Sequence, residues 1–96
     1  MTSLPQTIDI LKLKMDENPQ SLLFARLADK LLISHELDEA LDVCERGVKN
    51  HPYYVTGHYV MGKCYLAKGL MDQAEKEFKR AIFFDSKFLG AHKYYA

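Results

Sequence analysis

Apolar residues recur every three or four positions along most of this 96-residue chain, and no stretch alternates strictly between apolar and polar residues. Such spacing places apolar side chains on one face of an α-helix, whereas strict alternation would indicate a strand. The pattern predicts helices over residues 7–16, 19–34, 37–49, 53–68 and 70–84, and a last helix from residue 87 to the end. The sequence therefore predicts an all-α fold.

Residues with strong preferences for helix ends lie between the predicted helices. Asn18 is a favoured N-cap residue, and Pro52 disfavours a helical conformation in the residue before it. Gly69 suits the left-handed position that follows many helices. We expect Asp85 and Ser86 to end the helix over residues 70–84, with Ser86 capping the last helix.

One internal offset, of 34 residues, aligns the chain with itself. When residues 19–52 are aligned with residues 53–86, four positions are identical: Leu32 with Leu66, Asp38 with Asp72, Ala40 with Ala74, and Arg46 with Arg80. Elsewhere, large apolar residues fall on large apolar residues and small residues on small ones. A repeated two-helix unit of this length indicates a repeat architecture, in which each unit buries its apolar face against the next.

Each unit carries the same order of bulky and small residues. In the first helix of the two units they are Phe24, Leu27, Ala28 and Leu31, then His58, Met61, Gly62 and Tyr65. In the second helix they are Ala40, Cys44 and Gly47, then Ala74, Phe78 and Ala81. In this pattern and in its period the chain resembles the tetratricopeptide repeat family. The small residues let two helix backbones approach, and the bulky ones fill the space between neighbouring units.

The resemblance implies one domain, residues 1–96, of antiparallel helix–turn–helix repeats stacked as a short right-handed α-solenoid. Residues 19–52 and 53–86 are then two repeats. Residues 7–16 form an N-terminal helix that corresponds to the second half of an earlier, degenerate unit. Residues 87–96 form a partial third repeat or a capping helix.

Composition and charge exclude several classes of function. Hydrophobic residues make up 48% of the chain and charged residues 27%, which is typical of an ordered globular domain. Thirteen basic residues balance thirteen acidic ones, so the chain lacks the basic surplus that nucleic-acid binding requires. The N-terminal residues do not resemble a signal peptide, and no segment is apolar enough to span a membrane. We therefore expect a cytoplasmic protein that binds neither nucleic acid nor membrane.

The reactive side chains form no motif of known chemistry. His35, His51, His58 and His92 lack the spacing of metal ligands, and His58 and His92 are expected to be partly buried repeat positions. Cys44 and Cys64 are expected to be reduced, packed thiols. The glycines stand singly, so no phosphate-binding loop is present. We predict no enzyme activity, no catalytic residues, no metal and no cofactor.

By resemblance, the first helix of each unit lines a concave groove that binds a peptide or a helix of a partner protein. The groove residues are then Leu22, Ala25, Asp29, Leu32, Ile33, Thr56, Tyr59, Lys63, Leu66 and Lys93, with Gly90 beside them. These positions offer apolar patches and charges of both signs, which suits an amphipathic partner. One subset of the family binds carboxylate tails through Lys and Asn at the positions of Ala25 and Asp29. We therefore expect no binding of that kind.

An alternative function uses the ends of the molecule. The predicted last helix carries Phe88, Leu89, Tyr94 and Tyr95, whereas the terminal helix of a solenoid needs a polar outer face. This composition favours a structural or self-association module, forming a homo-oligomer through the C-terminal helix, or a fragment of a longer repeat array.

Overall fold

The computed structural model of the chain describes the backbone of residues 4–89 and the side chains of residues 6–85. This range contains helices and turns but no strand, which confirms the all-α prediction. The helices are α1 (Leu4–Glu17), α2 (Phe24–Ile33), α3 (Leu37–Asn50), α4 (Val55–Ala67) and α5 (Met71–Leu89).

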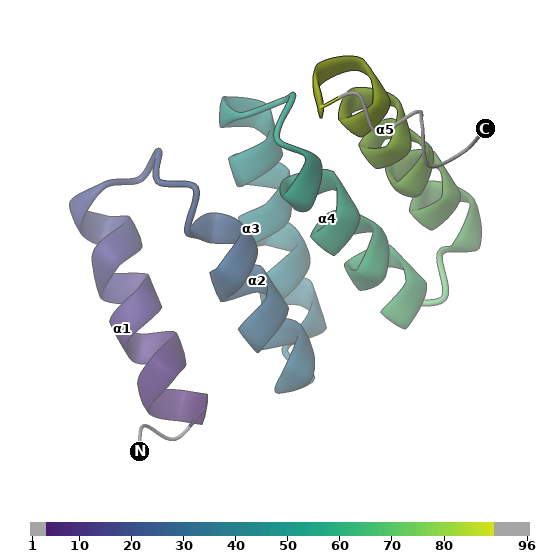
Figure 1. The fold of residues 1–96 in the computed structure, drawn as a ribbon. Coiled ribbons are helices and arrows are strands. Elements are labelled where there is room, and N and C mark those ends of the chain that lie inside the picture. Colours follow the sequence, from purple (N-terminus) through teal and green to yellow (C-terminus); the bar gives the residue numbers. More distant parts are fainter. Residues whose placement is uncertain (1–3, 90–96) are drawn as a thin grey trace.

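Successive helices run in alternating directions and each packs against the next (Figure 1). Two helical hairpins result, one from α2 and α3 and the other from α4 and α5. The first helices of the two hairpins, α2 and α4, also contact each other. The surface formed by α2 and α4 is therefore continuous from one hairpin to the next.

The turns of the two hairpins have the same backbone structure at positions 34 residues apart. His35 (φ 63°) and Gly69 (φ 79°) both adopt the left-handed conformation. The same two hydrogen bonds close each turn, as in a Schellman motif. They run from His35 N to Leu32 O and from Glu36 N to Leu31 O, then from Gly69 N to Leu66 O and from Leu70 N to Tyr65 O. The predicted conformation of Gly69 is confirmed, and the 34-residue offset extends from the sequence to the backbone.

The second helices of the hairpins also correspond. Ala40 and Ala74 each occupy the fourth position of their helix, α3 and α5. Their exposed fractions are 0% and 2%, and their amides donate to Glu36 and Leu70 respectively. An alanine is therefore buried at the same place in both hairpins, as the aligned sequence predicts.

The start of α2 differs from the prediction. A helix was expected from residue 19, but residues 18–23 form turns and α2 begins at Phe24. The Asn18 side chain accepts a hydrogen bond from the amide of Gln20, and the Ser21 hydroxyl accepts one from Leu23. Short polar side chains that bind their own backbone in this way favour turns over helix.

The predicted helix end at Asp85 and Ser86 is wrong, because α5 continues through both residues to Leu89. Neither residue breaks a helix as proline does, since each retains an amide hydrogen that can donate within the helix. Residues 87–89 are thus part of α5 and do not begin a new helix capped by Ser86. The rest of the predicted third unit, residues 90–96, lies outside the described residues.

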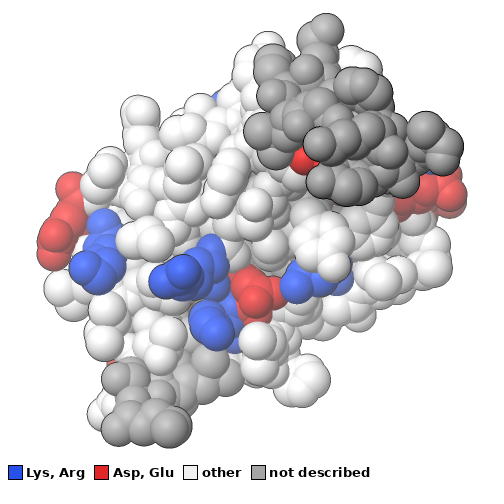
Figure 2. Space-filling model, in the orientation of Figure 1, with Lys and Arg blue, Asp and Glu red and all other residues white. Residues whose placement is uncertain are grey.

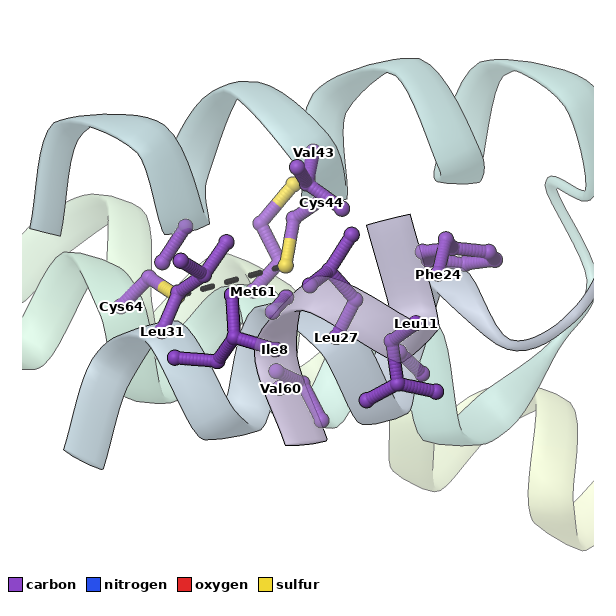
Figure 3. Packing of buried hydrophobic residues seen from close by; sticks show 13 residues of the cluster. Ile8, Leu11, Phe24, Leu27, Leu31, Val43, Cys44, Val60, Met61 and Cys64 are labelled. Atoms are coloured by element: carbon purple, nitrogen blue, oxygen red, sulfur yellow. Dashed lines mark hydrogen bonds between the residues drawn. The ribbon is translucent and has the colours of Figure 1, made fainter. Parts of the chain in front are cut away.

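The core is a cluster of buried side chains from α1, α2, α3 and α4 (Figure 3). Phe24, 1% exposed, lies at its edge, where its ring contacts the backbones of both α3 and α4. A Cβ atom on Gly47 of α3 would overlap this ring, and one on Gly57 of α4 would lie 2.7 Å from Phe24 Cζ. These glycines therefore allow one aromatic ring to fill the space between the two hairpins.

In the second hairpin, a glycine of α4 likewise makes room for an aromatic ring of α5. A Cβ atom on Gly62 of α4 would lie 2.5 Å from Cε1 of Phe78 on α5. Gly47 and Gly62 thus provide the close approach that the repeated pattern of small residues predicts.

Candidate functional site

The surface between α2 and α4 contains a hollow of about 520 Å³. Six of the residues predicted to line a groove surround it: Leu22, Ala25, Asp29, Thr56, Tyr59 and Lys63. Ala25 is 3% exposed and forms part of its floor, whereas Leu22 and Tyr59 are 47% and 51% exposed. The two helices therefore bring together predicted residues that are far apart in the sequence.

Three polar side chains are linked at the centre of this hollow. Lys63 Nζ donates a hydrogen bond to Asp29 Oδ1 at 2.7 Å, and it lies 5.3 Å from the centroid of the Tyr59 ring. The hydrogen bond with Asp29 raises the pKa of Lys63, although partial burial opposes it. Lys63 is therefore a fixed ammonium ion at neutral pH, held by a carboxylate and by an aromatic face.

The other predicted groove residues lie beside the hollow or beyond the described range. Leu32 is half-buried and packs on the core cluster. Ile33 and Leu66 are 54% and 45% exposed, near the C-terminal ends of α2 and α4. Lys93 and Gly90 lie outside the described residues. The structure thus brings together the predicted residues of the first and middle turns of the two helices.

The hollow is more basic than the predicted groove residues alone, because Arg26 and Lys30 also line it. Both follow Leu22 at helical spacing, at the fourth and eighth positions after it. Residues four apart share a helix face, so the sequence contained the signal that would have found them. The described lining then carries three basic side chains and one acidic one.

A second hollow, of about 480 Å³, lies on the other side of α2, between α1 and α3. Its walls include the core residues Phe24 and Leu27. Both of its basic side chains are paired, since Lys12 contacts Glu39 at 2.9 Å and Arg46 contacts Asp42 at 2.8 Å. It offers no exposed aromatic ring, so it is the weaker candidate for binding.

A buried polar cluster joins α4 to α5. His58 is 4% exposed, and its Nδ1 lies 2.8 Å from Glu77 Oε1 while its Nε2 lies 2.6 Å from the Pro52 carbonyl oxygen. A carboxylate and a carbonyl oxygen are both acceptors, so each ring nitrogen of His58 lies within hydrogen-bond distance of an acceptor. Glu77, also 4% exposed, accepts a further hydrogen bond from Arg80. His58 and Glu77 are closed to solvent, whereas the Arg80 side chain is 55% exposed, so the cluster is a structural contact between the two helices.

The two cysteines contact each other in the core. Cys44 of α3 and Cys64 of α4 are 0% exposed, with their sulfur atoms 4.0 Å apart (Figure 3). The hydrogen bond with Cys64 and burial raise the pKa of Cys44. Both are free thiols, as predicted from the sequence.

Within the described residues, no three His, Cys, Asp or Glu side chains gather as metal ligands would. None of the helices in the same range is long and apolar enough to cross a membrane. Comparisons of the chain with protein-family models, with curated proteins and with solved structures find no match.

Proposed function

We propose that this chain is a protein-interaction scaffold of the tetratricopeptide type, a short right-handed α-solenoid that binds a peptide or a helix of a partner protein in the hollow between α2 and α4. The observation that carries the proposal is the position of six predicted groove residues around one hollow. A peptide laid across α2 and α4 would contact both hairpins at once. The exposed Leu22 and Tyr59 are suited to anchor apolar side chains of such a partner.

The equivalent turns of the two hairpins support the repeat assignment. His35 and Gly69 share a left-handed conformation and a hydrogen-bond pattern at the 34-residue offset. Repeats of this kind place their first helices side by side and expose them along one face. The contact between α2 and α4 is of that kind.

The test is capture of partners with the intact chain and with a Tyr59→Ala, Lys63→Glu double variant. Saturable binding that the double variant loses is the expected result, because the variant removes the aromatic anchor and reverses the central charge. The matched control is Tyr53→Ala, Lys79→Glu, which makes the same two changes at exposed residues that do not line the hollow. Equal binding by the intact chain and the double variant would refute the assignment of the site.

A second function is favoured by the outer surface of α5. Met71, Ile82 and Phe83 are 62%, 48% and 58% exposed on this helix. We propose as the alternative that these side chains pack against another copy of the chain or another unit of a longer array. Light scattering from micromolar to millimolar concentration tests self-association, with Phe83→Glu as the disrupting variant. A monomer mass throughout that range would exclude a homo-oligomer.

A further inference from the structure

The surface around the proposed site is more basic than the chain as a whole. A third hollow, of about 470 Å³ between α1 and α2, shares Leu23 and Arg26 with the hollow between α2 and α4. It adds Lys14 from α1 and the 48%-exposed Ile10. The two hollows therefore form one continuous surface across α1, α2 and α4, which we call the α1–α2–α4 surface.

Basic side chains dominate the charge of this surface. It contains Lys14, Arg26, Lys30 and Lys63, against a single acid, Asp29. Figure 2 shows basic side chains over α2 and α4 near the centre of this face, with an acidic group between them. The whole chain has no net charge, so acidic residues are concentrated elsewhere.

Most of these cations have no counter-ion. Asp29 pairs with Lys63, but no described acidic side chain forms an ion pair with Lys14, Arg26 or Lys30. Unpaired cations of one sign along a groove attract a ligand of the opposite sign and speed its association. An incoming carboxylate would also compete with Asp29 for Lys63.

Apolar side chains lie among the cations. Ile10, Leu22 and Tyr59 are each about half exposed, at 48%, 47% and 51%. A nucleic acid could pair its phosphates with the cations and stack a base on the Tyr59 ring. It would leave Ile10 and Leu22 in contact with phosphates or water. A peptide with apolar residues on one side and carboxylates beside them matches both features.

Resting on the proposed function, we infer that the partner of the α1–α2–α4 surface is an acidic amphipathic peptide segment. Its apolar side chains lie against Ile10, Leu22 and Tyr59. Its carboxylates pair with Lys14, Arg26 and Lys30, and one of them displaces Asp29 from Lys63. A segment of about 16 residues, roughly 24 Å as a helix, is long enough to cross neighbouring helices.

The test is selection from a displayed library of random peptides of that length, with the full chain as bait. Peptides enriched in both Asp or Glu and apolar residues are expected. An enriched peptide should bind an Arg26→Gln, Lys30→Gln variant about tenfold more weakly, since two exposed ion pairs are lost. The matched control, Lys49→Gln, Lys76→Gln, removes two exposed lysines that line neither hollow and should bind as the intact chain does. Asp29→Asn should bind more tightly, because the competing carboxylate is removed.

The other outcomes separate the inference from the proposed function. Enriched peptides without excess acid, whose binding is lost only in the Tyr59→Ala, Lys63→Glu variant, overturn the acidic partner and retain the peptide site. No enrichment over a blank support overturns both. Displacement of a bound peptide by an oligouridine of similar length and at similar concentration overturns the inference in favour of a nucleic-acid partner.

Discussion

Lys63 follows Asp29 by 34 residues in the sequence, and its ammonium nitrogen lies 2.7 Å from the Asp29 carboxylate. The two residues therefore occupy the same position in successive hairpins and contact each other across α2 and α4. Their side chains are 33% and 34% exposed, so the pair is neither buried nor fully solvated. An ion pair between equivalent positions fixes the alignment of the two hairpins at the centre of the proposed site.

Replacing Asp29 with Asn should lower the free energy of unfolding at pH 7 by about 0.2–1 kcal/mol, the range for partly exposed ion pairs. The pKa of Lys63 is raised above its ordinary 10.5 by Asp29, so the pair stabilises the fold fully below that value. Its contribution is lost as the pH rises through the raised pKa. Urea titrations of the intact chain and the Asp29→Asn variant at neutral and strongly alkaline pH measure the difference in their free energies of unfolding. An equal difference at both pH values would contradict a contribution from this ion pair.

Gly47→Ala should destabilise the fold by about 1–3 kcal/mol, although alanine is the better helix former by about 1 kcal/mol. The added methyl group would overlap the Phe24 ring, which also lies close to the backbone of α4 at Gly57. Chemical denaturation of Gly47→Ala, Phe24→Leu and the double variant measures the coupling. Strictly additive losses would show that the ring and the glycine do not interact.

Glu77→Ala should lower the free energy of unfolding by about 1–3 kcal/mol, because it leaves His58 Nδ1 without its hydrogen-bond partner in a buried site. The control is Glu75→Ala on the same helix, where the side chain is 70% exposed and pairs only with Lys79. Glu75→Ala should change the free energy of unfolding by no more than about 0.5 kcal/mol. Thermal and urea unfolding of both variants provide the comparison, and similar losses for the two would refute the role of Glu77.

His35→Gly should stabilise the fold by about 0.5–1 kcal/mol. A residue with a side chain pays about 1–2 kcal/mol for the left-handed conformation that His35 adopts, and the flexibility of glycine in the unfolded chain offsets part of the gain. His35→Ala keeps the Cβ atom, and with it the cost of the left-handed conformation, so it should not stabilise the fold. The reverse change in the second turn, Gly69→Ala, should destabilise. A lower melting temperature for His35→Gly would count against this account.

The helical class, the 34-residue offset and the burial of Ala40 and Ala74 could all be predicted from the sequence, because each follows from regular spacing. The end of α5 could not, since neither Asp85 nor Ser86 prevents the helix from continuing. The left-handed conformation of His35 could have been predicted by aligning this residue with Gly69. A histidine alone does not indicate a left-handed residue, so only the repeat carries that information.

The predicted groove residues account for part of the lining of the hollow but not for its excess of basic side chains. Leu22, Tyr59 and Lys63 line the hollow as expected, whereas Arg26 and Lys30 were not among the predicted residues. Glu77 was not among the residues predicted to be buried, although it lies three residues after Ala74 on the buried side of α5. Its partner, His58, comes from another helix, and spacing within one helix cannot reveal such a pairing.

The ring of Phe24 has a consequence for how the molecule unfolds. One side chain on α2 contacts the backbones of α3 and α4, so separating the hairpins exposes a large aromatic surface that both of them help to cover. Loss of either hairpin then removes part of the stability of the other. Melting should therefore be a single cooperative transition in the natural chain, and it should separate into two steps only when this ring is replaced by a smaller group.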